Sequence, residues 1–138
     1  MDTGRRSCLT GLFTLPFLPG IAARHETKAA SLIVQARTQI GVTTFYDAAY
    51  VALDYPRGDI PRDRGVCIDV IIRAYRDAFD FDFQKHIHED MAAHFQAYPK
   101  RWGLTRTDRN IDHRRVPNVE TWLERYGHEL PAQNWQPG

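Results

Sequence analysis

Apolar residues recur every three to four positions in four segments of the chain, and this spacing predicts amphipathic helices. The segments are residues 29–40, 67–79, 82–97 and 118–126. Residues that favour helix ends flank them: Asp63 and Asn118 suit the cap before a helix, Gly41 and Gly127 the position after one, and Pro99 stops the third helix. Only residues 44–46 favour a short extended piece. The pattern therefore predicts a mostly helical small domain.

The apolar positions also predict which side of each helix faces the core. The expected core stripes are Leu32, Ile33, Ala36 and Ile40, then Ile68, Ile71, Ile72, Tyr75 and Phe79, then Phe83, Ile87, Met91 and Phe95, and finally Val119, Trp122, Leu123 and Tyr126. In the second helix, Asp69 with Arg73 and Arg76 with Asp80 are spaced four residues apart. Such pairs are typical of a solvent-facing surface, where we expect them to lie.

The first 22 residues have the design of an export signal. Arg5 and Arg6 precede an apolar run that ends in small residues, and Gly20 and Ala22 suit cleavage after Ala22. The run is too short and too interrupted by proline to span a bilayer, and the adjacent arginines resemble a twin-arginine signal. We expect a periplasmic or secreted protein without a stable membrane span, whose mature domain covers residues 29–138. The alternative is an uncleaved membrane anchor.

Cys67 is the candidate nucleophile. The chain has 2 cysteines, and signal removal would take away Cys8, leaving Cys67 as the only thiol in an oxidising compartment. Cys67 lies in the first turn of its predicted helix, where free N–H groups and the helix dipole favour a thiolate. The alternative is a small buried hydrophobic residue, because Cys67 shares a helix face with Ile71 and Ala74.

Residues 100–117, here called the basic loop, show no amphipathic period. Between positions 100 and 115 the acidic residues are Asp108 and Asp112, whereas the basic ones are Lys100, Arg101, Arg106, Arg109, Arg114 and Arg115. Arginine binds carboxylates and phosphates through two parallel hydrogen bonds, and His113 adds a candidate general base. The alternative is a loop held by internal Arg–Asp pairs. A net charge of +1 and the lack of interleaved aromatic residues argue against a nucleic-acid partner.

The third predicted helix carries the remaining candidate for metal binding. His86, Asp90 and His94 are spaced four residues apart and can share one helix face. The zinc-protease pattern is broken, however, because Ala92 stands where a second histidine is required after His88. These polar residues flank the apolar stripe, where solvated side chains normally lie. We therefore predict no metal and no cofactor.

Several longer motifs resemble a known family. They are residues 46–50, 58–76, 98–118 and 136–138. Together they resemble the YijF-like family of exported bacterial proteins of unknown function, of the DUF1287 type. That family is in turn distantly similar to the NlpC-type, papain-like cysteine hydrolases. In those enzymes the cysteine opens a helix packed on an antiparallel sheet, and a histidine on a following strand activates it. The resemblance implies an α+β papain-like fold with Cys67 as the nucleophile.

The chain departs from the family at its C-terminal end. Members of the family continue after the Pro-Gly turn into an apolar strand and then a strand with a His-Ile-Gly motif, whereas this sequence ends at Gly138. We therefore expect a truncated chain that is mostly α, with the C-terminal antiparallel sheet largely absent. His113 is then the remaining candidate for the activating base.

The first functional hypothesis is a cysteine hydrolase or amidase that acts on cell-wall peptides. Cys67 would attack the carbonyl group, and the candidate substrate-binding residues are Asp69 at the helix start and Asp112, Arg114 and Arg115 in the basic loop. The second is a non-catalytic envelope module that binds an anionic ligand through the basic loop. The third is a fragment that truncation has made inactive.

Overall fold

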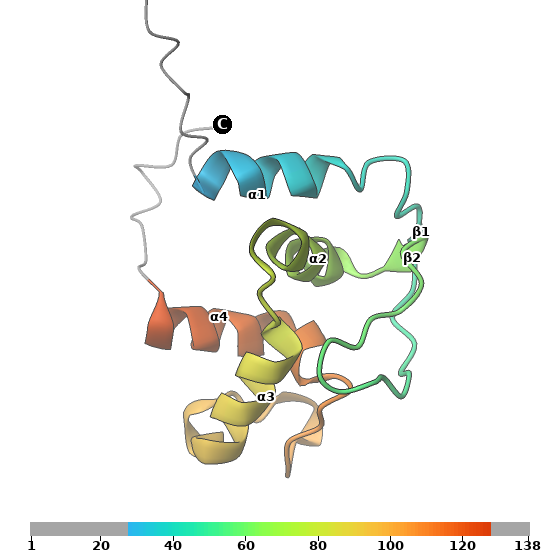
Figure 1. Ribbon diagram of the computed structural model, residues 1–138. Helices are drawn as coiled ribbons and strands as arrows, with labels where there is room; N and C mark the ends of the chain where they lie inside the picture. Colours follow the sequence, from blue (N-terminus) through green and yellow to red (C-terminus); the bar gives the residue numbers. More distant parts are fainter. Residues whose placement is uncertain (1–27, 128–138) are drawn as a thin grey trace, which may run out of the picture.

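The computed structural model describes residues 28–127 (Figure 1). The predicted export signal, residues 1–22, and the tail after residue 127 lie outside the described residues. The α-helices are α1 (Lys28–Arg37), α2 (Cys67–Phe79), α3 (Phe83–Ala93) and α4 (Val116–Tyr126). The strands are β1 (Phe45–Tyr46) and β2 (Arg64–Gly65), and the 3₁₀ turns are η1 (Phe95–Ala97), η2 (Arg101–Gly103) and η3 (Asp112–Arg114).

The helices form the body of the molecule, with α2 between α1 on one side and α3 and α4 on the other (Figure 1). Strands β1 and β2 lie beside the N-terminal end of α2. They pair in parallel, with Phe45 opposite Arg64 and Tyr46 opposite Gly65. The predicted mostly helical domain is therefore confirmed. The sheet in the described part of the chain is this small parallel pair, and no antiparallel sheet occurs there.

The hydrophobic core lies where α2, α3 and α4 meet. Its buried members are Ile68, Ile72, Phe83, Ile87, Met91, Tyr98 and Val119. Phe83 lies at the centre, fully buried, with its ring centroid 5.0 Å from that of Tyr75 and 5.7 Å from that of Trp122. These contacts confirm the apolar stripe of α3 and, in part, those of α2 and α4, of which Ile68, Ile72 and Val119 are buried and Tyr75 and Trp122 pack against the core.

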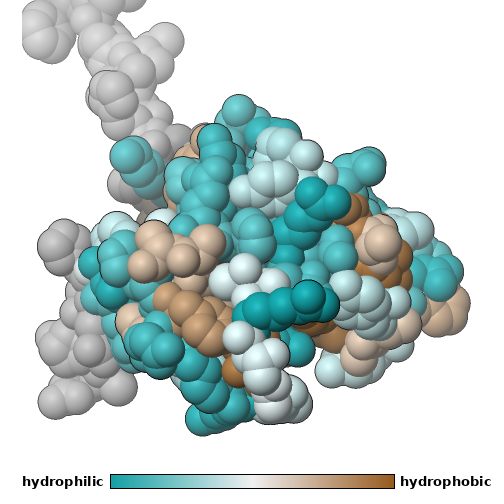
Figure 2. Space-filling view, turned by 90° about the horizontal axis from the view of Figure 1, so that it is seen from below, coloured by the Kyte–Doolittle hydropathy of each residue, from teal (hydrophilic) through white to brown (hydrophobic). Residues whose placement is uncertain are grey.

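Six predicted core positions are exposed instead, and the prediction is wrong for each: Ile33, Ile40, Ile71, Phe79, Leu123 and Tyr126. Ile40 is 80% exposed because α1 ends at Arg37 and the following turn carries Ile40 away from the other helices. Ile71 is 41% exposed, on the side of α2 turned away from the core. Within α1 no residue is fully buried. In Figure 2, which shows the molecule from below, apolar side chains are interspersed with hydrophilic ones and form no single large patch.

The predicted charged surface of α2 is wrong. Arg73 is fully buried and forms an ion pair of 2.9 Å with Asp59 in the preceding loop, while Asp69 is also buried. Arg76 likewise pairs with Asp59, at 3.2 Å. Helical spacing indicates that two side chains share a face, but the loop before α2 covers that face and supplies a closer carboxylate.

Helix starts and ends also differ from the predictions. Val66 caps α2 in place of Asp63, and Arg115 caps α4 in place of Asn118. Asn118 lies inside α4, is buried, and donates from its side-chain amide to the carbonyl oxygen of Asp112 at 3.0 Å. Helix α3 ends at Ala93 and is followed by η1, so Pro99 terminates a 3₁₀ turn and not the helix itself. No helix within residues 28–127 has the length and apolar character needed to cross a membrane.

Candidate functional site

Cys67 is the first residue of α2, immediately after strand β2. The backbone at Val66 is extended, with φ −108° and ψ 171°, so the chain turns directly from the strand into the helix. The thiol is free and exposed, which excludes a buried hydrophobic role for this side chain. Within residues 28–127 no other cysteine is present and no hydrogen bond joins the thiol to a described residue.

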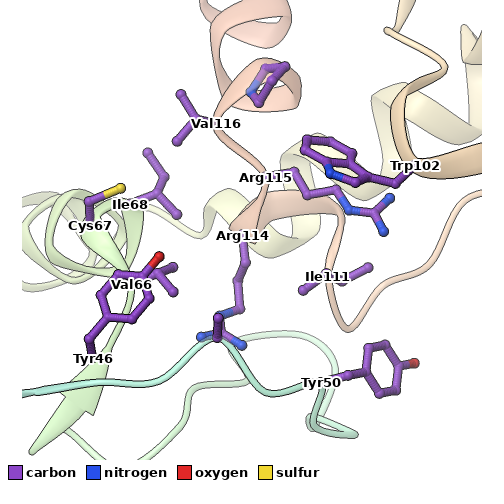
Figure 3. A pocket seen from close by; sticks show the side chains of 12 residues that line it. Tyr46, Tyr50, Val66, Cys67, Ile68, Trp102, Ile111, Arg114, Arg115 and Val116 are labelled. Atoms are coloured by element: carbon purple, nitrogen blue, oxygen red, sulfur yellow. The ribbon is translucent and has the colours of Figure 1, made fainter.

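The thiol lines a cavity of about 580 Å³. Three parts of the chain form its walls: the segment from Tyr46 to Tyr50, the start of α2, and the part of the basic loop from Trp102 to Pro117. In Figure 3 Cys67 and Tyr46 lie on the left, Trp102 and Arg115 on the right, and Arg114 between them. Of the site residues predicted from the sequence, Cys67, Arg114 and Arg115 line this cavity.

Arg114 forms the floor of the site and is already paired. Its Nε donates to Asp69 Oδ1 at 3.0 Å and its Nη2 to Asp69 Oδ2 at 2.9 Å. The same guanidinium donates to the carbonyl oxygens of Asp47 and Ala49, at 3.3 and 3.4 Å. Both side chains of the ion pair are almost completely buried. Arg114 thus joins η3, α2 and the segment after β1, and its charge is neutralised by Asp69.

Asp69 also closes the turn on which Cys67 lies. Its Oδ2 accepts the backbone N–H of Val66 at 2.7 Å. Gly65 permits this close approach, because a Cβ at that position would lie 2.9 Å from Asp69 Oδ2 and 3.1 Å from Asp69 Cβ. Asp69 does not line the cavity. Because it binds the N–H of Val66, it positions the start of α2 from beneath.

Arg115 is the unpaired guanidinium of the cavity. It lies over the indole of Trp102, with its Cζ 5.0 Å from the ring centroid. Its Nη1 is buried and has no hydrogen-bond partner among the described residues, and no ion pair there includes Arg115. Trp102 itself is 64% exposed and has a left-handed backbone with φ 56°.

His113 and Asp112 lie outside the cavity. His113 is only 2% exposed, and burial lowers the pKa of its imidazole to about 4. Its Nδ1 has no partner among the described residues. Asp112 accepts from the backbone N–H of Asp108 and lies 3.0 Å from His88 Nδ1, and burial raises the pKa of its carboxyl. The structure brings neither residue into the cavity with Cys67.

The residues tested for metal binding have other partners. Asp90 binds Arg125, Tyr98, Tyr126 and the neighbouring His94. His86 stacks on Phe81, with ring centroids 4.5 Å apart. Over residues 28–127 no group of three or more histidine, cysteine, aspartate or glutamate side chains is arranged to hold a metal ion.

The aromatic wall of the cavity, formed by Tyr46, Tyr50 and Trp102, was not predicted from the sequence. Tyr46 and Tyr50 occur in one of the family motifs, but residues 47–50 form neither a helix nor a strand, so their spacing of four does not indicate a shared site. Trp102 stands next to Gly103, which also has a positive φ of 67°. A Trp-Gly pair in a loop is the available signal of an unusual turn there, since glycine adopts this conformation without strain.

Comparison with known proteins confirms the family resemblance. A family model described as a domain of unknown function, DUF1287, matches residues 33–138. The uncharacterized protein YijF of Escherichia coli (strain K12) is 59% identical over 97 residues, covering 70% of this chain and 47% of YijF. This chain therefore spans about half the length of that curated relative. No solved structure matches this chain. Because the family model covers well over half of the sequence, the chain belongs to the DUF1287 family.

Proposed function

We propose that this chain forms the nucleophile-bearing part of an exported, papain-like cysteine hydrolase that cleaves an amide bond in cell-envelope peptides. The observation that carries the proposal is the position of Cys67. Its free, exposed thiol is at the first residue of a 13-residue helix and lines a cavity large enough for a small peptide segment. The resemblance to NlpC-type hydrolases, which place their cysteine at a helix start, supports the same role.

The proposed reaction begins with the thiolate of Cys67. It attacks the carbonyl carbon of the amide, a C–S bond forms, and the π electrons of the carbonyl group move to its oxygen. The backbone N–H groups of Cys67 and Ile68 have no acceptor in the helical ladder, because they belong to the first turn, and they donate to this oxyanion. The oxyanion then collapses, the C–N bond breaks, and the amine leaves with the proton that the general base took from the Cys67 thiol. Water cleaves the thioester, releasing the acid and the thiol.

The general base in this proposal is a histidine on the strand that follows the present region in longer family members. His113 is not assigned that role, because it is buried, does not line the cavity, and makes no hydrogen bond to Cys67. Asp69 and Arg114 act as positioning residues, since their mutual ion pair holds the start of α2 beneath the thiol.

The reactivity of Cys67 tests the proposal. In the full chain carrying Cys8→Ser, Cys67 is the only thiol, and its alkylation by iodoacetamide is followed from pH 5 to pH 9. We expect the native chain to react about tenfold faster at pH 7 than the same chain in urea, because the free N–H groups at the start of α2 and the cavity around the thiol exist only in the folded chain. The measurement is the second-order rate constant at each pH, obtained by mass spectrometry.

A second thiol position on the same helix provides the control. Ile71 is also exposed but lies one turn later, so an Ile71→Cys substitution in a chain lacking the other two cysteines places a thiol away from the helix start. This thiol should react no faster in the native chain than in urea. If Cys67 behaves in the same way, its proposed role as the nucleophile is contradicted. A non-catalytic envelope module that binds an anionic ligand then becomes the better explanation.

A further inference from the structure

We propose that Arg115 and Trp102 form a subsite for a carboxylate of the bound molecule, across the cavity from Cys67. The inference deepens the proposed function, and it rests on that function only in taking the bound molecule to be the substrate. It separates two neighbouring arginines that the sequence could not distinguish: Arg115 binds the ligand, whereas Arg114 holds the site together.

Arg114 and Arg115 differ in how their charges are neutralised. Both arginines line the cavity, but the guanidinium of Arg114 is matched by the carboxylate of Asp69 at 2.9 Å. Arg115 has no such carboxylate among the described residues, so it leaves a net positive charge at the wall. A cation beside largely apolar walls, here including Ile111 and Val116, attracts an anion more strongly than one in open water.

Arg115 also has an unused hydrogen-bond donor. The Nη1 of Arg115 is buried and lacks an acceptor among the described residues. Buried donors almost always have a partner, and leaving one unpaired is unfavourable. A planar carboxylate suits an arginine, because its two oxygens can accept two parallel N–H bonds. Arg115 therefore has a donor without a partner, which a carboxylate would satisfy once a small side-chain shift uncovers Nη1.

Trp102 lies exposed at the wall of the cavity. Its indole is 64% exposed, although a residue of this size normally buries most of its surface, and its backbone has the left-handed φ of 56°. A strained conformation that displays an apolar ring favours a role in binding over a role in packing. The ring holds the Arg115 guanidinium at 5.0 Å and fixes its position at the cavity wall.

A carboxylate can come from two sources in a peptide: its C-terminal end or an acidic side chain. The chemistry that Arg115 recognises is the same in both, so the subsite is assigned to the carboxylate group and the experiment separates the sources.

The test compares two aromatic disulfides that react with Cys67 in the Cys8→Ser chain. One is 5,5′-dithiobis(2-nitrobenzoate), which carries carboxylates, and the other is the uncharged 4,4′-dithiodipyridine. In both cases the thiolate attacks one sulfur, a mixed disulfide forms, and an aromatic thiol leaves. The ratio of the two rate constants cancels the fraction of Cys67 present as thiolate. We expect Arg115→Gln to lower the rate with the anionic reagent about three- to tenfold and to change the rate with the neutral reagent less than about twofold.

Arg106→Gln is the matched control, because it removes the same charge from an exposed position of the basic loop that does not line the cavity. It should leave the ratio unchanged. Arg115→Met, which keeps an apolar stem over Trp102, serves as the second variant if Arg115→Gln fails to fold. An unchanged ratio in the folded Arg115 variant overturns the subsite, whatever the absolute reactivity of Cys67. Conversely, native rates no faster than those in urea overturn the proposed nucleophile and leave the ratio as a valid test of the subsite.

Protection of Cys67 from 4,4′-dithiodipyridine identifies the source of the carboxylate. The probes are acetyl-Ala-Ala with a free C-terminus, acetyl-Ala-Ala-amide, and acetyl-Ala-Glu-amide. Protection by the first alone assigns a terminal carboxylate, and protection by the third alone assigns an acidic side chain; in both cases Arg115→Gln should abolish it. Equal protection by acetyl-Ala-Ala-amide would contradict carboxylate recognition.

Discussion

Buried arginines account for much of the structure around the candidate site. Arg73 donates to Asp59 and to the carbonyl oxygen of Ile60, and Arg114 donates twice to Asp69. Each guanidinium joins segments that are distant in sequence, because its five donors can satisfy several acceptors at once. Removing one partner of such a pair is costly, since the other charge remains buried without compensation. These arginines therefore act as parts of the scaffold, and their charge is not free to bind a ligand.

His113 predicts a pH dependence of stability. Burial lowers the pKa of its imidazole to about 4, so the folded chain keeps the ring neutral while the unfolded chain binds a proton near pH 6.5. Stability is therefore lost as the pH falls from about 6.5 to about 4, and the loss should reach roughly 3 kcal/mol. Urea unfolding across this pH range, followed by circular dichroism, measures the effect.

A substitution isolates this contribution from those of other groups. Asp112, whose pKa is raised by burial, shifts stability in the opposite direction in acid, so the native chain must be compared with His113→Gln. The variant should lose less stability than the native chain between pH 6.5 and pH 4. His86→Gln, which removes an exposed histidine, is the control and should keep the native slope. Parallel slopes for the native chain and His113→Gln would show that folding does not change the pKa of His113 and would contradict the prediction.

The junction between β2 and α2 is the element on which the candidate nucleophile depends. Gly65 ends the strand, Val66 caps the helix, and Asp69 binds the N–H of Val66 from inside the first turn. The pairing of β1 with β2 fixes the other side of the junction. Cys67 is therefore held by backbone contacts on one side and by the Asp69–Arg114 ion pair beneath.

We expect Gly65→Ala to destabilise the fold by about 1–3 kcal/mol, because the added Cβ would lie 2.9 Å from Asp69 Oδ2, which is already held by Arg114 and Val66. Urea unfolding measures the change. A double-mutant cycle with Asp69→Ala supplies the control, because removing the carboxylate should reduce the cost of Gly65→Ala. The same cost in both backgrounds would place the strain elsewhere in the junction.

The elements themselves were predictable to different degrees. The core stripe of α3 could be predicted from its spacing, because Phe83, Ile87 and Met91 are large apolar residues on one helix face, which is buried in the core. The charged residues of α2 were misplaced, because a charge can be buried when a partner such as Asp59 comes from a loop whose path the sequence does not reveal. The place of Cys67 at a helix start was predicted and is confirmed, whereas the position of Trp102 depends on a left-handed turn that only the structure shows.

At the scale of the whole molecule, the carboxylate of Asp90 joins the C-terminal half of the fold. It lies in α3 and accepts from Tyr98 after η1, at 2.6 Å, and from Arg125 in α4, at 2.8 Å. The hydroxyl of Tyr126 donates to the same carboxylate. Burial by itself would raise the pKa of Asp90, but hydrogen bonds from Arg125, Tyr126 and Tyr98 outweigh it and hold the pKa well below its usual range.

Asp90→Asn should therefore weaken the docking of α4 on α3. The variant keeps the shape of the side chain but loses the charge that strengthens each hydrogen bond, and we expect a loss of about 2–4 kcal/mol at pH 7. Because the folded pKa is depressed, this contribution is present above the unfolded value of about 4 and is lost as the pH falls below it. Urea unfolding at pH 7 and pH 3 should show a smaller acid effect in the variant than in the native chain.

Asp77→Asn is the matched control, because Asp77 pairs with Arg62 at 2.7 Å on the surface, where such a pair contributes at most about 1 kcal/mol. Hydrogen exchange locates the effect: amides of α4 should exchange faster in Asp90→Asn, whereas those of α2 that pack on α1 should keep their protection. If α2 loses protection to the same extent, the domain unfolds as one cooperative unit. The start of α2, and with it Cys67, would then depend on a carboxylate in a different helix, and the stability of the candidate site would be a property of the whole chain.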